Sequence, residues 1–172
     1  QGPTASFKDF AARMMARLMS HCRPQGERIN ILVATSGDTG SAVGEAFKGV
    51  AGIDVIILYP EKEVSPRQKK QLDTIGKNVR ALSVDGKFDD CQNLVKQAFA
   101  DKEMKRFNLS SANSINFGRI LPQIVYYVYA YAQLAQGGEE IIFSVPSGNF
   151  GNALGCEFAR RMGLPVAKLV MP

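Results

Sequence analysis

The sequence predicts an α/β fold built on parallel sheets. Short apolar runs, mostly without polar alternation, alternate along the chain with stretches whose apolar residues have helical spacing. Such runs are typical of strands covered on both faces, and their alternation with helices is typical of right-handed βαβ units. The strands are expected at 29–35, 54–60, 79–84, 141–146 and 165–172, with a less clear short strand within 107–116. The helices are expected at 9–22, 40–50, 65–76, 88–107, 119–136 and 152–163.

The helix expected at 119–136 contains four tyrosines, at positions 126, 127, 129 and 131. They could stack on a cofactor or on a nucleic-acid base. Their neighbours Ile124, Val125, Val128 and Leu134 are apolar, which favours a largely buried helix that packs in a core or an interface. Pro122 is compatible with the first turn of this helix.

The composition is that of a soluble globular protein. Hydrophobic residues make up 45% of the 172 residues and charged residues 22%, which are ordinary values. The net charge of +5 would permit nucleic-acid binding, but the 21 Lys and Arg are dispersed among 16 acidic residues. The densest basic runs, at 67–71 and 101–106, have the spacing of solvated helix faces. We therefore expect no nucleic-acid partner, while a basic site for a small anion stays open.

The cysteines and the single histidine exclude two common classes of small domain. Cys22, Cys91 and Cys156 are widely spaced, and His21 cannot complete a usual zinc set with them, so neither a disulfide framework nor a metal site is expected. No run reaches the length of a membrane span, and no signal region opens the sequence. These features predict a reducing compartment, the cytoplasm, and no membrane partner.

Two expected strands end in glycine-rich turns that lead into helices, at 33–47 and 143–158. The N-terminus of a helix offers unpaired N–H groups and a positive dipole end, which together favour an anion. Neither turn matches the dinucleotide or the Walker-type pattern, and either one alone could be an ordinary connection. Because ligands of parallel α/β sheets bind beyond the carboxyl ends of strands, both turns could serve one ligand.

Two further motifs contain residues able to do chemistry. "GPTASFKD", at 2–9, places Lys8 at the start of the first expected helix, where a lysine can also be an ordinary solvated residue. "NSINFGR", at 113–119, offers amides and a guanidinium that suit an oxyanion, although an Asn at this place can simply cap a helix.

Together, "GPTASFKDF", "TSGDTGSA", "NSINFGR" and "VPSGNFGNALG", in this order and at these separations, resemble the threonine synthase family of pyridoxal-phosphate fold type II enzymes. The motifs extend from residue 2 to about residue 155. The resemblance implies the three-layer parallel sheets of fold type II, similar to the tryptophan synthase β chain, with a complete small lobe and a partial large lobe.

The resemblance also implies a role for each matching residue. Lys8 matches the lysine that binds pyridoxal 5'-phosphate covalently and then shuttles protons. The loop that wraps the cofactor's phosphate matches Gly148, Asn149, Phe150, Gly151 and Asn152. The loop that grips the substrate α-carboxylate matches Ser36, Gly37, Thr39 and Gly40, with Asp38 at the position that approaches the 3′ oxygen of the cofactor. Asn113 and Arg119 match residues that bind the substrate's phosphate.

The activity implied is that of a carbon–oxygen lyase acting on phosphates, which converts O-phospho-L-homoserine and water into L-threonine and phosphate, the last step of threonine biosynthesis. The same cofactor motifs would serve a related phospho-lyase that releases phosphate without making threonine. A folded but inactive binding module is an alternative of another class. The small-molecule substrate would be the partner, and the chain would be a monomer or a homodimer.

The resemblance implies a division into lobes. Residues 1–28 would carry the opening helix and the cofactor lysine of the large lobe, 29–134 would form the small lobe, and 135–172 would belong to the large lobe. Family members are longer at both ends, so we expect this chain to be a central fragment.

Overall fold

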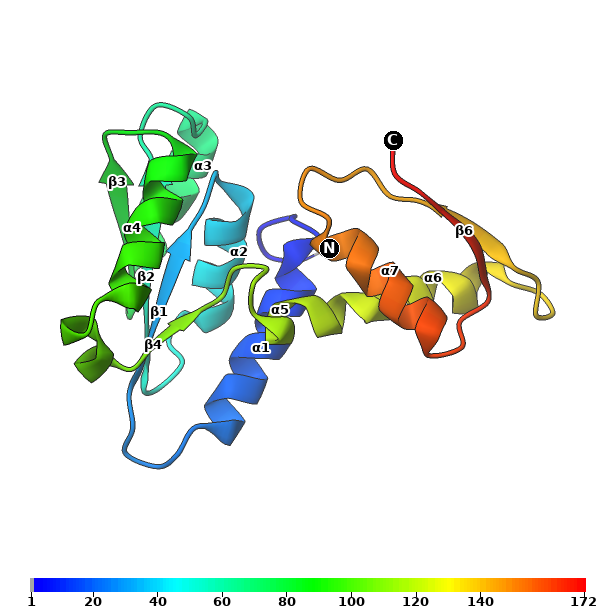
Figure 1. Cartoon of the computed structure of the whole chain (residues 1–172), viewed down its shortest axis with the longest axis horizontal. Coiled ribbons are helices and arrows are strands. Elements are labelled where there is room, and N and C mark those ends of the chain that lie inside the picture. The colour runs from blue at the N-terminus through cyan, green and yellow to red at the C-terminus, as the bar shows by residue number, and fades with distance from the viewer. Residues whose placement is uncertain (1) are drawn as a thin grey trace. The chain divides into compact units, whose positions relative to one another are not determined.

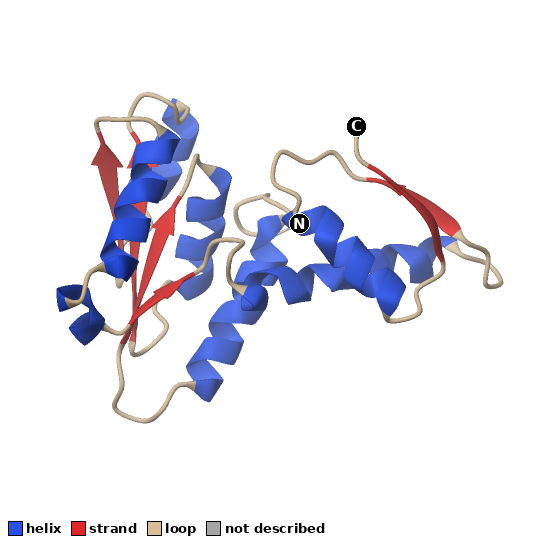
Figure 2. Ribbon diagram, viewed as in Figure 1, coloured by secondary structure: helices blue, strands red, loops and turns tan. Residues whose placement is uncertain are grey.

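The computed structural model describes residues 2–172 and confirms the α/β prediction, because helices and strands alternate along the chain (Figure 2). The chain divides into two compact units, the first ending at Ile115 and the second comprising Asn116–Pro172. The three-part division into lobes stays a prediction. No helix within residues 2–172 has both the length and the apolar character needed to cross a membrane.

The first unit contains a four-stranded parallel sheet. Its strands are β1 (Ile29–Ala34), β2 (Ile53–Pro60), β3 (Val79–Val84) and β4 (Leu109–Ser111), in the spatial order β3-β2-β1-β4. The register places Ile31 beside Val55, and Val55 beside Val79. The apolar runs therefore predicted these strands correctly, including the short strand within 107–116.

Helices cover both faces of this sheet (Figure 1). On one face lie α1 (Lys8–Cys22), α2 (Asp38–Phe47) and α3 (Pro66–Asp73), and on the other lies α4 (Phe88–Ala100). Alternate residues of the strands supply the two cores: Ile31, Val33, Val55 and Ile57 face α1 and α2, whereas Leu32 and Ala34 face Cys91 and Val95 of α4. Burying one such aliphatic side chain contributes about 1.5–3 kcal/mol. Because helices cover both faces of the sheet, apolar side chains are favoured on both, and the strands do not alternate between polar and apolar residues.

The helix expected at 88–107 is shorter than predicted. It ends at Ala100, and a separate 3-10 segment, η1 (Glu103–Phe107), follows. Asp101 has extended backbone angles (φ −71°, ψ 125°), and its Oδ1 accepts a hydrogen bond from the Glu103 N–H at 2.8 Å. The short Asp side chain offers the backbone an alternative to the helix at this point.

The second unit is built from α5 (Phe117–Ile120), η2 (Leu121–Gln123), α6 (Ile124–Leu134), α7 (Gly151–Arg161) and two parallel strands, β5 (Ile141–Ser144) and β6 (Val166–Val170). Its core is small and consists of Ile124, Tyr127, Val145, Ala153, Cys156, Ala159 and Val166. Within this unit α6 and α7 pack together (Figure 1).

Two expectations about the tyrosine-rich helix are wrong. It is not one α-helix from residue 119, because the 3-10 segment η2 separates α5 from α6, and Pro122 within η2 has no N–H to continue the hydrogen-bond ladder. It is not largely buried either, since of its residues only Ile124 and Tyr127 are buried, whereas Tyr129 is 67% exposed. In this chain α6 buries one stripe of side chains.

Candidate functional site

Lys8 is the first residue of α1 and is half-buried. Its backbone N–H donates to Ser6 Oγ at 3.2 Å, and its Nζ lies 4.8 Å from the ring centroid of Phe7. The loop before the helix therefore fixes the point from which the lysine side chain leaves the backbone.

The turn after β1 is organised by Thr35, a residue that the sequence analysis did not single out. Thr35 is buried, and its Oγ1 accepts hydrogen bonds from the N–H groups of Gly37 (3.0 Å) and Gly40 (2.8 Å). Gly37 has φ +140°, a conformation that favours glycine. A Cβ on Gly40 would overlap Thr35 and crowd Ile57, so this glycine allows α2 to lie directly against the sheet.

Asp38 begins α2 and is held by the next helix. Its Oδ1 accepts a hydrogen bond of 3.0 Å from Gln68 Nε2, and Gln68 also forms the capping box of α3 with Ser65. An acid in the first turn of a helix is favoured by the helix dipole. Ser36 and Asp38 are exposed and Thr39 is partly exposed, so this turn presents polar groups and first-turn N–H groups at its surface.

Asn113 lies just after β4, and its side-chain amide is bonded to β1. Its Nδ2 donates to the Ala34 carbonyl oxygen at 2.8 Å, and its Oδ1 accepts from the Ala34 N–H at 3.3 Å. The amide thus imitates one more pair of sheet hydrogen bonds beyond β4. It also brings Asn113 to the carboxyl end of β1, where the Ser36–Gly40 turn begins.

The second glycine-rich turn, which leads into α7, is held by its own side chains. Asn149 Oδ1 accepts from the Gly151 N–H at 3.1 Å, and Asn152 Oδ1 accepts from the Ala153 N–H at 2.9 Å. The Asn152 amide also donates to the Pro146 carbonyl oxygen at 3.3 Å. A Cβ on Gly148 would meet nothing within 4 Å, which leaves one side of the turn open.

Tyr127 supports this turn, a role that the sequence analysis missed. Its hydroxyl donates to the Asn152 carbonyl oxygen at 2.7 Å, and burial raises the pKa of Tyr127 to about 12. The phenol is therefore a neutral hydrogen-bond donor over the physiological range of pH. No local pattern marks this pair, because 25 residues separate the tyrosine from its partner.

Arg119 is the most unusual charged residue of the second unit. Its side chain is only 3% exposed, and its Nε and Nη1 have no hydrogen-bond partner among residues 2–172. Burial lowers the pKa of Arg119 to about 10, so the guanidinium is still a cation at neutral pH. A buried cation with unused donors is costly unless an anion binds to it.

Gln123 lies one helical turn beyond Arg119 and bonds to it through the backbone. The buried Gln123 side chain donates from Nε2 to the Arg119 carbonyl oxygen at 2.9 Å, in the stretch where Pro122 interrupts the helix. Like Arg119, it keeps a buried polar atom, Oε1, with no partner within the described chain.

The predicted residues are distributed over both units. Lys8, the Ser36–Gly40 turn and Asn113 belong to the first unit, and Arg119 and the 148–152 turn belong to the second. Each unit offers features that fit a phosphorylated cofactor and an anionic substrate: a half-buried lysine and a polar turn in the first, and an open helix N-terminus and a buried cation in the second.

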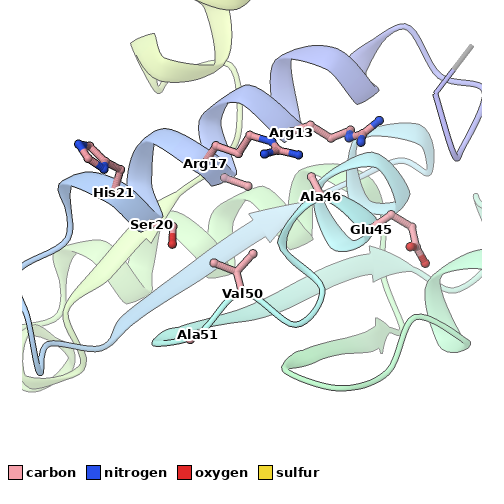
Figure 3. Close-up of a pocket in the computed structure, with 9 residues that line it drawn as sticks. Arg13, Arg17, Ser20, His21, Glu45, Ala46, Val50 and Ala51 are labelled. Carbon is pink, nitrogen blue, oxygen red and sulfur yellow. The ribbon is translucent and has the colours of Figure 1, made fainter.

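A surface hollow lies elsewhere on the first unit, between α1 and the end of α2. Figure 3 shows Arg13, Arg17 and His21 along α1, opposite Glu45 and Val50. None of the residues predicted from the sequence lines this hollow. Among residues 2–172, no three His, Cys, Asp or Glu side chains form a group that could hold a metal ion.

Comparison with known proteins identifies relatives over the whole chain. A family model described as pyridoxal-phosphate dependent enzyme matches residues 1–172. The threonine synthase of Escherichia coli K12 is 49% identical over 172 residues, an alignment that covers 98% of this chain and 40% of that protein. The chain thus spans about 40% of the length of this relative.

Solved structures of threonine synthases are similar to this chain along almost its whole length. A crystal structure of PLP-bound threonine synthase from Brucella melitensis superimposes with a TM-score of 0.89 at 47% identity, covering 99% of this chain and 37% of that one. The structure of the Escherichia coli threonine synthase gives a TM-score of 0.90 at 48% identity, over 98% of this chain and 40% of that chain. The predicted fold type II is confirmed.

Proposed function

Since this chain belongs to the family of pyridoxal-phosphate dependent enzymes, we propose that it supplies cofactor-binding and substrate-binding segments of a threonine synthase. The observation that carries the proposal is the 49% identity to a threonine synthase along almost the whole chain. The reaction converts O-phospho-L-homoserine and water into L-threonine and phosphate. The cofactor, when bound, supplies an electron sink that stabilises carbanions, while the protein supplies binding and orientation.

Lys8 is the residue to which the cofactor is attached, and its amine moves protons at Cα and Cβ of the substrate. The turn formed by Gly148, Asn149, Phe150, Gly151 and Asn152 holds the cofactor's phosphate against the N-terminus of α7. The helix dipole and the first-turn N–H groups suit this role, and the side chains of Asn149 and Asn152 keep the turn in place.

The turn formed by Ser36, Gly37, Thr39 and Gly40 binds the α-carboxylate of the substrate at the N-terminus of α2. Asp38 would interact with the 3′ oxygen of the cofactor. The bond from Gln68 to Asp38 supports this assignment, because it limits the rotamers of a side chain that is otherwise exposed.

Arg119 and Asn113 bind the phosphate of the substrate. The departing phosphate needs fixed positive charge, which the buried guanidinium provides. Asn113 uses one of its two Nδ2 hydrogens on Ala34, and an amide nitrogen carries a second that can donate to a phosphate oxygen. Excluding water around Arg119 makes its interaction with the anion stronger than it would be at the surface.

The setting of the enzyme is also a proposal. We place it in the cytoplasm as a monomer or a homodimer, with no nucleic-acid partner. The dispersed charge of the sequence supports the last point.

The test uses a chimera in which this chain replaces the aligned residues of the Escherichia coli threonine synthase, since that relative supplies the remaining parts of the enzyme. The chimera is mixed with pyridoxal phosphate, reduced with borohydride and mapped by mass spectrometry. The expected result is a phosphopyridoxyl group on Lys8 that is absent from the matched Lys8→Arg variant. Labelling confined to other lysines would refute the assignment.

A further inference from the structure

Asp9, the residue after the proposed cofactor lysine, is one of the most deeply buried polar groups of the chain. It is 1% exposed, whereas Lys8 is half-buried and Phe10 is exposed. An acid in the first turn of a helix commonly stays in solvent, where the helix dipole alone stabilises it. Burial at this place needs another explanation, and the hydrogen bonds of Asp9 provide one.

Both carboxylate oxygens of Asp9 bind the same residue of the preceding loop. Oδ1 accepts from Thr4 Oγ1 at 2.6 Å, and Oδ2 accepts from the Thr4 N–H at 3.0 Å. Hydrogen bonds to an ionised acceptor are shorter and stronger than neutral ones. The two bonds connect the start of α1 to a point five residues earlier and close the loop that precedes Lys8.

The loop itself is held in an unfavourable conformation. Ala5 has φ +58°, in the left-handed region that residues with a Cβ rarely adopt. Its N–H bonds the Gly2 carbonyl oxygen at 3.1 Å. Such a conformation persists where the surrounding structure fixes it, and the Thr4 bonds to Asp9 flank Ala5 directly.

The loop also packs closely on Asp9. A Cβ on Gly2 would overlap the Asp9 side chain, so only glycine allows the backbone to pass there. The Ser6 side chain then accepts from the Lys8 N–H at 3.2 Å, and the Ser6 carbonyl oxygen accepts from the Asp9 N–H at 3.1 Å. Thr4 and Ser6 are thus bonded to Asp9 directly, and the Lys8 N–H is connected to it through Ser6.

We propose that Asp9, through Thr4, is a positioning residue for Lys8: it clamps the Gly2–Ser6 loop in one conformation and so fixes where the lysine amine meets the cofactor. The clamp rests on the proposed role of Lys8. If Asp9 positions Lys8, weakening either bond between Thr4 and Asp9 slows the reaction of Lys8 with the cofactor, while the rest of the fold stays intact.

The experiment measures the rate of borohydride trapping at Lys8, in this chain and in the chimera, with pyridoxal phosphate as the probe. Asp9→Asn keeps the shape of the side chain but replaces one acceptor oxygen with an NH₂ group. We expect at least a tenfold slower trapping at Lys8 in Asp9→Asn and a several-fold slower trapping in Thr4→Val. The conservative Thr4→Ser variant keeps the hydroxyl, and its rate should lie within twofold of the parent.

Lys48 and Lys69 of the same molecule serve as internal controls, since each forms an ion pair 3.2 Å long that is remote in sequence from the loop. Their trapping rates should change by less than twofold in every variant. If Asp9→Asn leaves Lys8 within twofold of the parent, or if all three lysines change together, the positioning role is wrong.

Hydrogen exchange separates this inference from the proposed function. If the parent itself shows no label on Lys8, the cofactor assignment fails, and exchange of the peptide containing residues 2–7 decides whether the clamp exists. At least tenfold faster exchange in Asp9→Asn supports the clamp, and unchanged exchange overturns it.

Discussion

Asn113 and Arg119 are six positions apart and were assigned the same role from the sequence, yet the structure surrounds them in opposite ways. The amide of Asn113 bonds both backbone groups of Ala34, so it is already part of the first unit's sheet. Arg119 belongs to the second unit and is buried, and two donor atoms of its guanidinium have no partner among the described residues. The Asn113 side chain thus has a structural use without any ligand, whereas the Arg119 guanidinium leaves two donor atoms unused.

The difference shows how a binding residue can be separated from a supporting one. Removing a satisfied buried group leaves its partners without hydrogen bonds, which costs about 1–3 kcal/mol for each of them. Replacing even a buried ion pair by well-packed apolar residues is often neutral or stabilising by about 1–4 kcal/mol, and a buried charge with unused donors pays its desolvation cost with less compensation, so an apolar residue in its place should not destabilise the fold. Substituting Arg119 should therefore weaken substrate binding without lowering the stability of the fold, whereas substituting Asn113 should lower both.

The largest effect is expected at Arg119. In the chimera, Arg119→Met should lower kcat/KM for O-phospho-L-homoserine by 100-fold or more, about 3 kcal/mol of lost transition-state stabilisation. The same substitution should raise the free energy of unfolding by about 1–2 kcal/mol, because a desolvated charge disappears.

The matched control is Arg160→Met, since Arg160 is exposed and pairs with Glu157 at the surface. Its kcat/KM should stay within twofold of the parent. Loss of stability together with activity in Arg119→Met would mean that the guanidinium is structural, and the contrast with Asn113 would fail.

Asn113→Ala is expected to destabilise the chain by about 2 kcal/mol, because the Ala34 N–H and carbonyl groups lose their partners. Urea unfolding followed by circular dichroism measures this change. Unaltered stability combined with a large rise in KM would make Asn113 a residue that serves only the ligand.

Thr35→Val tests how far the first glycine-rich turn depends on one hydroxyl. Two buried backbone N–H groups lose their acceptor, so we expect a loss of about 2 kcal/mol. Thr35→Ser retains the acceptor and should lie within about 0.5 kcal/mol of the parent. Equal unfolding midpoints in urea for the Val and Ser variants would show that the turn forms without this hydroxyl.

Tyr127→Phe should have the smallest effect, about 1 kcal/mol, because it removes a single bond to the Asn152 carbonyl oxygen. The expected local consequence is faster hydrogen exchange in the 148–152 turn, with the exchange of α2 unchanged. Exchange that speeds up equally in both units would place the role of Tyr127 in general stability.

Local sequence patterns predicted the strands well and the ends of the helices less well. A buried parallel strand is a continuous apolar run, which is visible without any tertiary information. The C-terminal end of α4 and the helical segments around Pro122 depend instead on one Asp side chain and one missing N–H. The exposure of α6 was not predicted, because an apolar sequence does not show how much of a helix surface the neighbouring elements cover.

The candidate site shows the same limit. Lys8, Asp38 and Arg119 were singled out because they lie in motifs that together resemble those of the threonine synthase family. The supporting roles of Thr35, Gln68 and Tyr127 were missed, because these side chains acquire their roles from partners that folding brings near. The bond between Gln68 and Asp38, 30 residues apart, is an example. Such support is a property of the fold rather than of the local sequence.

The most direct test of the central claim measures threonine and inorganic phosphate together, as the chimera consumes O-phospho-L-homoserine. The account predicts one threonine for each phosphate, and no turnover in Lys8→Arg. Phosphate released with 2-oxobutyrate in place of threonine would contradict the account and make the enzyme a phospho-lyase.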